Sequence, residues 1–385
     1  MVGAMTCWFS ATAVVPELTR DWLLNPSQAG WLTNGVQIGF VSGALISSLV
    51  NLPDLMRLTR LIAISALVAA SANAVLLFDP GWPVAVIARV VTGMALAGIY
   101  PPAMKLMATW FRRGRGLAMG ALIGALTFGS SMPHLFRAVS DGLDWRLVVS
   151  LASLGAVLSA AIFGLLIREG PYAFARAVFD PRRALTIFRD RGVLLANLAI
   201  LAICGSFTPC GHGLTFATVA EQGGVGPFAS PSLFAFIVVA SGAAGCILGG
   251  LLSDRIGRCL TTAGMMAVSG ACALLIGFAF DGPEWLLALI AVIWGVTIAG
   301  DSAQFSTAVT ELADPRFIGT ALTLQVSIGF ALTVLTIWIM PHIAAALGGW
   351  RWAFLVLLPG PVIGAWAMLR LRKLPEAARL AGGRG

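Results

Sequence analysis

Two ionisable side chains, Arg89 and Asp301, stand inside long apolar stretches of the sequence. Placing a charge in an apolar environment is costly, so such residues are candidates for function. A carboxylate at Asp301 would take up a proton readily or hold a cation. Two structural alternatives stay open: Arg89 could extend its guanidinium group to a polar boundary, and Asp301 could satisfy a polar contact between helices.

The composition indicates which elements position these residues. The chain has 385 residues, of which 58% are hydrophobic and 11% charged, and its mean hydropathy is +0.90. So few charged residues could not cover a soluble domain, and the sequence therefore predicts an all-α membrane protein with many spans. The net charge of +8 is not gathered in a basic cluster with interleaved aromatic residues, so nucleic acid is not an expected partner.

A third candidate residue, His212, lies in the segment Phe-Thr-Pro-Cys-Gly-His-Gly at 207–213. One proline and two glycines cannot all sit in a straight helix, so a broken membrane segment is predicted there. Binding groups are often placed at such breaks, although a lone histidine such as His212 is more often a packing residue. Lys105 is interpreted as extending to the nearer membrane boundary.

The sequence offers no set of residues for covalent or metal chemistry. It contains no His-Glu-x-x-His pattern, no pair of membrane aspartates and no nucleotide-binding loop, and its six cysteines lack Cys-x-x-Cys spacing. We therefore expect neither an enzyme nor a bound metal or cofactor.

Apolar runs predict twelve transmembrane helices, arranged as two pseudo-symmetric six-helix bundles. The expected divisions are a first half over 1–167, an arginine-rich central loop over 168–192, a second half over 193–372 and a tail over 373–385. Helix 1, over 2–15, is too short to cross a bilayer, which suggests that the natural chain begins upstream of Met1. Helix 4, over 83–110, should bend near Tyr100, where two prolines follow.

The two halves repeat each other at a nearly constant separation. Asp54 corresponds to Asp254, and Trp145-Arg146 corresponds to Trp350-Arg351. Asp-Pro-Gly-Trp at 79–82 likewise corresponds to Asp-Gly-Pro-Glu-Trp at 281–285. Of the 25 Lys and Arg residues, nineteen fall in loops and termini on one side and four on the other, so both termini are predicted to be cytoplasmic.

A short charged turn, Gly-Gly-Leu-Leu-Ser-Asp-Arg-Ile-Gly-Arg at 249–258, separates two apolar runs. Its glycines permit close approach and a tight reversal, and its acid beside two arginines can lock onto a neighbouring helix end. The pattern Gly-x-x-x-Asp-Arg-x-Gly-Arg resembles the signature loop of the major facilitator superfamily of secondary transporters. The predicted cytoplasmic gate motif comprises Gly250, Asp254, Arg255, Gly257 and Arg258, with Asp54 and Arg57 in a degenerate copy.

This resemblance, which covers essentially the whole chain, implies that helices 1, 4, 7 and 10 line a central cavity. Helices 2, 5, 8 and 11 would join the halves. The spacing Arg89-x-x-x-Gly93 is similar to a helix-4 motif that is associated with proton-coupled members. The candidate cavity residues are Trp8, Arg89, Tyr100, His212, Trp294 and Asp301.

The pseudo-symmetry of that family also implies specific contacts of the gate motif. Asp254 should meet the start of helix 5 near Gly116 when the cytoplasmic side is closed, because a helix N-terminus attracts a carboxylate. Asp54 should meet the start of helix 11 near Gly319. Opening the cavity toward the cytoplasm would break both contacts.

The solute is only coarsely indicated. Tyr-Pro-Pro at 100–102, leading to Trp110-Phe111 and Arg115-Gly116, is similar to bacterial small-solute porters, among them anion permeases of the cyanate or nitrate type. Nitrate porters, however, carry arginines in helices 2 and 8, which 29–50 and 233–252 lack. We expect a monomeric secondary active transporter in a bacterial inner membrane, which moves a small polar or anionic solute by alternating access with proton coupling. A receptor or sensor on the same fold that does not transport is the alternative.

Overall fold

The computed structural model describes residues 1–50, 52–111, 114–139, 144–172, 191–208, 230–314 and 318–384, without the side chains of 26, 54, 200–208 and 319–320. Every regular element in these ranges is a helix. Ten helices among them are long and apolar enough to cross a membrane. The predicted all-α membrane architecture is thus confirmed for the described part of the chain.

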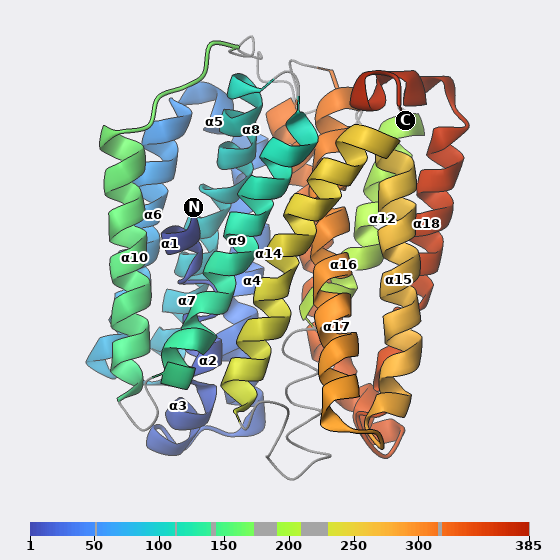
Figure 1. Ribbon diagram of the computed structural model, residues 1–385. Coiled ribbons are helices and arrows are strands. Elements are labelled where there is room, and N and C mark those ends of the chain that lie inside the picture. Colours follow the sequence, from blue (N-terminus) through green and yellow to red (C-terminus); the bar gives the residue numbers. More distant parts are fainter. Residues whose placement is uncertain are drawn as a thin grey trace.

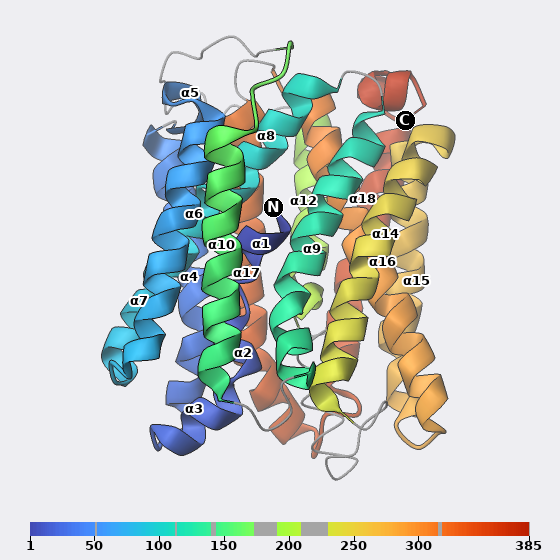
Figure 2. The ribbon, with the colours of Figure 1, turned by 60° about the vertical axis from the view of Figure 1, so that its left-hand side comes forward.

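The first half of the chain forms one group of helices and the second half another (Figures 1 and 2). The first group contains α1 (Val2–Met5), α2 (Ser10–Ala13), α3 (Val15–Asp21), α4 (Pro26–Val50), α5 (Leu52–Leu55), α6 (Leu58–Ala74), η1 (Val75–Phe78), α7 (Trp82–Ala97), α8 (Tyr100–Trp110), α9 (Arg115–Val139) and α10 (Trp145–Leu165). The second contains α12 (Arg191–Thr208), α14 (Pro231–Ile256), α15 (Arg258–Ala279), α16 (Glu284–Leu312), α17 (Ile318–Ala346), η5 (Ala353–Leu357), α18 (Pro359–Arg372) and η6 (Pro375–Gly382). The halves meet where α9 packs on α14 and α4 packs on α17.

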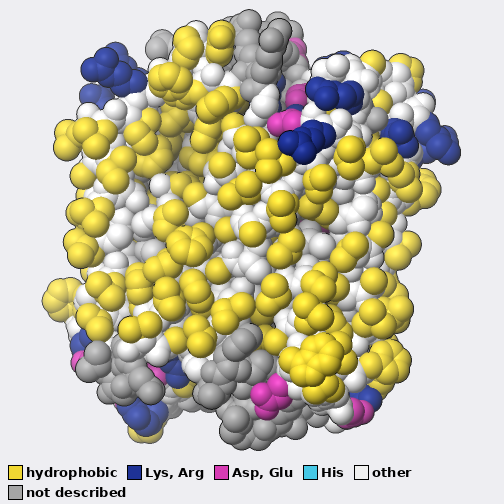
Figure 3. All heavy atoms as spheres, in the orientation of Figure 1, with side chains coloured by type: hydrophobic (Ala, Val, Ile, Leu, Met, Phe, Trp, Pro, Cys, Tyr) yellow, Lys and Arg dark blue, Asp and Glu magenta, His cyan; other side chains and the backbone are white. Residues whose placement is uncertain are grey.

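The outer surface suits a lipid environment. In Figure 3, hydrophobic side chains cover the middle of the visible face, and the charged side chains gather toward its two ends. Large apolar side chains are exposed on the outer helix faces, including Phe278 at 60% and Trp366 at 58%. A helix satisfies its own backbone hydrogen bonds, so such faces can lie against acyl chains.

The first membrane segment is broken, which differs from the single helix expected over 2–15. It consists of α1, α2 and α3, and residues 6–9 between α1 and α2 leave the helical hydrogen-bond pattern. The carbonyl oxygens of Cys7 and Trp8 accept hydrogen bonds from the side chain of Arg89. Pro16 lies in the first turn of α3, where a missing N–H group is tolerated. The N-terminus lies at mid-height in the bundle (Figure 1).

The bend expected in helix 4 near Tyr100 is confirmed. The structure divides this segment into α7 and α8 at Gly98 and Ile99. A Cβ atom at Gly98 would lie 2.2 Å from the hydroxyl oxygen of Ser65 on α6, so a larger residue there would require the side chain of Ser65 to move. Pro101 and Pro102 follow in the first turn of α8, where their missing N–H groups cost no helical bond.

Close backbone contact joins the two halves along α9 and α14, which lie side by side in both ribbon views (Figures 1 and 2). A Cβ atom at Gly120 would lie 2.3 Å from the carbonyl oxygen of Cys246, and one at Gly250 would lie 2.6 Å from that of Gly116. Small residues at such positions let helices approach closely in a membrane.

Candidate functional site

The gate motif sits at the contact between the halves. We call the end of the bundle that carries Ser253 to Arg258 the motif end. Asp254 accepts hydrogen bonds from the backbone N–H groups of Gly116, at 3.2 Å, and Leu117, at 3.1 Å. Both groups belong to the first turn of α9, where N–H groups have no partner within the helix. The predicted contact of Asp254 with the start of helix 5 is therefore confirmed.

Arg258 holds this contact in place from below the surface. Its side chain is 1% exposed and donates two hydrogen bonds of 2.7 Å to the carboxylate of Glu311 on α16. It also donates to Ser253, at 2.9 Å, and to Asp254, at 3.4 Å. Gly257 has φ +99°, a conformation that an L side chain would strain, so the turn requires glycine there.

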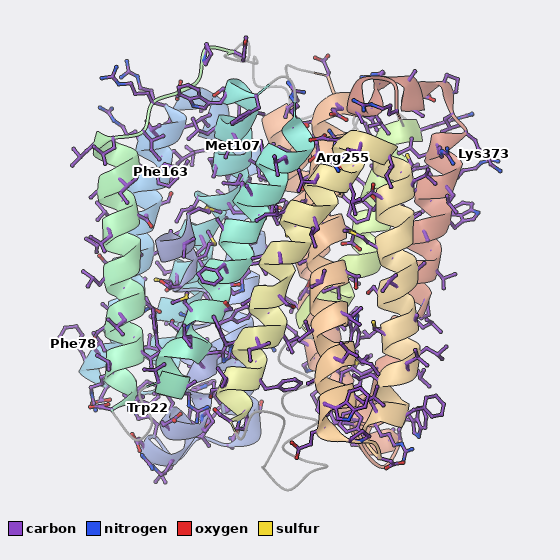
Figure 4. The ribbon with its side chains drawn as sticks, in the orientation of Figure 1. Trp22, Phe78, Met107, Phe163, Arg255 and Lys373 are labelled. Carbon is purple, nitrogen blue, oxygen red and sulfur yellow. The ribbon has the colours of Figure 1, made fainter. Side chains whose placement is uncertain are left out.

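The remaining gate residues are Arg255, Arg57 and Asp54. Arg255 is exposed and points outward at the motif end (Figure 4), and Arg57 is an exposed residue just before α6. The side chain of Asp54, on α5, lies outside the described residues, and its contact near Gly319 stays a prediction.

Each half also places a chain segment over the motif end, which the sequence analysis did not foresee. In the second half, the N–H group of Ala381 in η6 donates to Glu311, at 3.0 Å. In the first half, the segment after α10 packs on the end of α8: the N–H group of Gly170 donates to Thr109, at 2.9 Å. Glu169 there accepts from the N–H group of Leu58, at 2.7 Å. The two glutamates thus connect helix ends to segments that look like loops in sequence.

Arg89 lies at the centre of a buried polar cluster in the first half. Its side chain is fully buried and donates to the carbonyl oxygens of Trp8, at 2.6 Å, and Cys7, at 3.0 Å. It also donates to Asn73 of α6, at 2.9 Å, and to Ser10, at 3.2 Å. This arrangement excludes extension of Arg89 to the membrane boundary. The guanidinium group instead donates to two carbonyl groups of the broken first segment.

Trp8 and Tyr100 lie at an aromatic cluster between the halves. The ring of Trp8 lies 4.9 Å from that of Phe40 on α4 and 5.0 Å from that of Phe330 on α17, measured between centroids. The rings of Phe40 and Phe330 are 4.8 Å apart, and Tyr100 lies 6.4 Å from Phe40. We call Trp8, Phe40, Tyr100 and Phe330 the aromatic cluster. It brings together the broken first segment, α4, α8 and α17.

Asp301 lies buried in the second half. Its Oδ1 atom accepts from the hydroxyl group of Ser302, at 3.3 Å, and its Oδ2 atom has no hydrogen-bond partner among the described residues. Trp294 is fully buried on the same helix and donates to Ser269 of α15, at 3.1 Å, beside Phe354. These contacts of Trp294 lie within the second half, so they support packing and do not bring it to the aromatic cluster. His212 lies outside the described residues.

Comparisons with known proteins agree with this geometry. The chain belongs to the Major Facilitator Superfamily, whose family model matches residues 1–336 and 243–385. A solved structure of the proton:xylose symporter XylE with 6-bromo-6-deoxy-D-glucose superposes with a TM-score of 0.73 over 96% of this chain and 93% of that one. At 15% identity, this likeness concerns the fold alone. The fold is therefore that of the superfamily, and the predicted family is confirmed.

Two curated relatives are transporters. The niacin transporter NiaP of Acinetobacter baylyi is 24% identical over 49% of this chain and 43% of its own length. The 3-(3-hydroxy-phenyl)propionate transporter of Escherichia coli is 33% identical over 36% of this chain and 33% of its own length. The chain thus matches less than half of either relative. With the family, these relatives make the protein a membrane transporter and not an enzyme.

Proposed function

We propose that the protein is a secondary active transporter that moves a small aromatic carboxylic acid by alternating access, with proton coupling. The observation that carries this proposal is the aromatic cluster, in which rings from both halves meet beside buried polar groups. Flat solutes stack well against such rings. The names of the two relatives support the class, because niacin and 3-(3-hydroxyphenyl)propionate each join a carboxyl group to an aromatic ring.

Alternating access is supported by polar contacts between the halves at opposite ends of the bundle. Asp254 binds the start of α9 at the motif end, and Arg137 of α9 donates to Ser232 of α14, at 3.2 Å, at the other end. A few hydrogen bonds at each end can break and form again while the apolar middle acts as a pivot. We assign the motif end, with both termini, to the cytoplasmic side of a bacterial inner membrane, in agreement with the distribution of Lys and Arg.

Proton coupling is assigned to Asp301, a buried carboxyl group with an unpartnered oxygen. Such a group changes its charge when it gains or loses a proton and so changes the cost of its burial. Arg89 is assigned a supporting role, because it fixes the segment that presents Trp8 to the aromatic cluster. His212 stays a candidate solute ligand on helix 7.

Uptake into liposomes tests the proposal. Vesicles with the purified protein should accumulate radiolabelled nicotinic acid or 3-(3-hydroxyphenyl)propionic acid when the outside is acidic, and a protonophore should abolish this accumulation. Xylose should not accumulate. Binding of either acid without accumulation would instead favour a receptor on the same fold.

A further inference from the structure

Gln37 of α4 is a fully buried carboxamide whose oxygen and nitrogen both lack a hydrogen-bond partner among the described residues. Leaving a buried donor or acceptor unsatisfied costs on the order of 1–3 kcal/mol for each group. Native proteins rarely keep such a pair, and a missing ligand is one explanation. The position of Gln37 beside the aromatic cluster favours that explanation.

The register of α4 shows which way Gln37 faces. Gly35 and Gly39 pack on α7, since a Cβ atom at Gly39 would lie 2.0 Å from the carbonyl oxygen of Val90. Gln37 is two residues from each glycine and so points to the opposite side of the helix, because successive residues turn by about 100°. Phe40, one turn further, touches Trp8 and Phe330. Gln37 therefore lies next to the cluster, on the side of α4 turned away from α7.

The unpartnered oxygen and nitrogen of the Gln37 carboxamide indicate a chemical class of ligand. A carboxamide offers one acceptor and one donor side by side, and a neutral carboxylic acid or a primary amide offers the complementary pair. A carboxylate has no donor to give. Arg89, the cation on the neighbouring α7, already donates to backbone carbonyl groups and to Asn73. An anion at Gln37 would thus lack a free cationic partner among the described residues.

The balance of costs favours the neutral acid. Protonating an acid of pKa about 4 at pH 7 costs about 4 kcal/mol, at about 1.4 kcal/mol for each pH unit. Burying a carboxylate with no counter-ion costs several kcal/mol or more.

The elements packed against α4 carry few charged or titratable side chains. These are Arg89 on α7, Glu17, Arg20 and Asp21 on α3, Asp54 on α5 and His342 on α17, with Tyr100 beside Phe40.

We propose that Gln37 and the aromatic cluster form the solute site, in which the ring stacks on Trp8, Phe40 and Phe330 while Gln37 pairs with the solute's carboxyl group in its protonated form. This inference rests on the proposed function, which supplies the aromatic acid. One proton then enters with each solute molecule, bound to the solute itself, in addition to the proton that the proposed function assigns to Asp301. Gln37 is the residue that distinguishes an acid or amide from an ester, which has acceptors only.

Binding to the purified full chain in nanodiscs tests this site. The probes are nicotinic acid, nicotinamide and methyl nicotinate, and 3-(3-hydroxyphenyl)propionic acid with its primary amide and methyl ester. The acid and the amide of one series should bind, and its ester should bind at least about tenfold more weakly. Affinity for the acid should fall about tenfold for each pH unit above the solute pKa, whereas affinity for the amide should not change with pH.

Two variants complete the test. Gln37→Met keeps the length of the side chain and should weaken binding of acid and amide roughly 10- to 100-fold, in line with the loss of two hydrogen bonds. Gln325→Met is the matched control, because Gln325 of α17 is equally buried and unpartnered among the described residues but lies five residues, and so about 140° of helical turn, from Phe330. The Gln325→Met variant should bind the acid and the amide as tightly as the unaltered protein does.

Equal binding of acid and ester, acid affinity that does not change with pH, or unchanged binding in Gln37→Met would overturn the inference and leave the proposed function standing. If none of the six probes binds the unaltered protein, the proposed solute class is wrong and this inference is lost with it.

Discussion

Arg89 shows at the scale of one residue how a buried charge can serve structure and transport together. Its described partners are carbonyl, hydroxyl and amide oxygens of three neighbouring segments, and none is a carboxylate. A buried arginine is tolerated when its donors are all used. Under the proposed function, Arg89 would act on the solute through Trp8, whose backbone it holds.

We expect Arg89→Ala to lower stability as well as uptake. The change removes the donors that satisfy Cys7, Trp8 and Asn73, and each buried acceptor left unsatisfied costs about 1–3 kcal/mol. A thermal unfolding scan in detergent should show a clear fall in midpoint. Arg20→Ala, at an arginine whose side chain is 79% exposed, is the control and should leave the midpoint unchanged. An unaltered midpoint in Arg89→Ala would show that the broken segment does not depend on this cluster.

Asp301 poses the opposite case, because its substitution should spare the fold. Asp301→Asn keeps the shape of the side chain, and the hydroxyl group of Ser302 is its hydrogen-bond donor among the described residues. The substitution leaves a side chain that is always neutral. Uptake driven by a pH gradient should therefore fall at least about tenfold, while exchange of labelled for unlabelled solute continues. Glu284→Gln, at an exposed glutamate in the first turn of the same helix, controls for the loss of a charge. Gradient-driven uptake that survives in Asp301→Asn would move proton coupling away from this residue.

At the scale of elements, the sequence predicted contacts that depend on backbone rules and missed those that depend on packing. The contact of Asp254 with α9 was predictable because the family resemblance indicated the partner helix, and a helix N-terminus attracts a carboxylate placed against it. The division of helix 4 followed from its prolines. The break in the first segment was not predictable, because its cause is Arg89, far away in sequence. The segments that cover the motif end were missed for the same reason, since Glu311 and Ala381 meet only in the fold.

The contact of Asp254 on α14 with the N-terminus of α9 can be tested by substitution. Asp254→Asn should shift the population toward the state that is open at the motif end, because a carboxylate at a helix N-terminus contributes about 0.3–2 kcal/mol. The ratio of the open to the closed population at the motif end should therefore rise by a factor of roughly 2 to 30. Nitroxide labels at Phe111 and Ile256, two exposed positions at the motif end in different halves, should report longer distances by pulsed electron resonance. A cysteine at position 304 would be a poor reporter, since Gln304 is buried and accepts from Arg258, at 3.1 Å.

The whole molecule repeats its contacts as well as its helices. Arg146 forms an ion pair with Asp79 in the first half, and Arg351 forms the corresponding pair with Asp281 in the second. These are the residues that the sequence repeat aligned. Each pair ties its own half together at the end opposite the motif, so each half can move as a unit. The contacts that must change in alternating access are then those between halves, at Asp254 and at Ser232.

If the halves move as units, weakening the contact between halves at one end should shift the conformational equilibrium in the opposite direction from weakening the contact at the other end. Ser232→Ala removes the acceptor of Arg137 across the interface and leaves the pair of Arg137 with Glu17 intact. A hydrogen bond to a charged group contributes about 1.5–3 kcal/mol when buried and less here, where Arg137 is 31% exposed. A loss of about 1 kcal/mol would favour the state open at that end about fivefold. Shorter mean distances between the labels at Phe111 and Ile256 should follow.

The double variant Asp254→Asn with Ser232→Ala then decides whether one equilibrium connects the two ends. With rigid halves, the two shifts are free-energy changes of opposite sign on the same two states, so they should largely cancel. The label distances should return close to those of the unaltered protein, although both contacts are gone. If the ends open independently, the double variant should instead keep the longer distances of Asp254→Asn, because loosening the far end would not close the motif end.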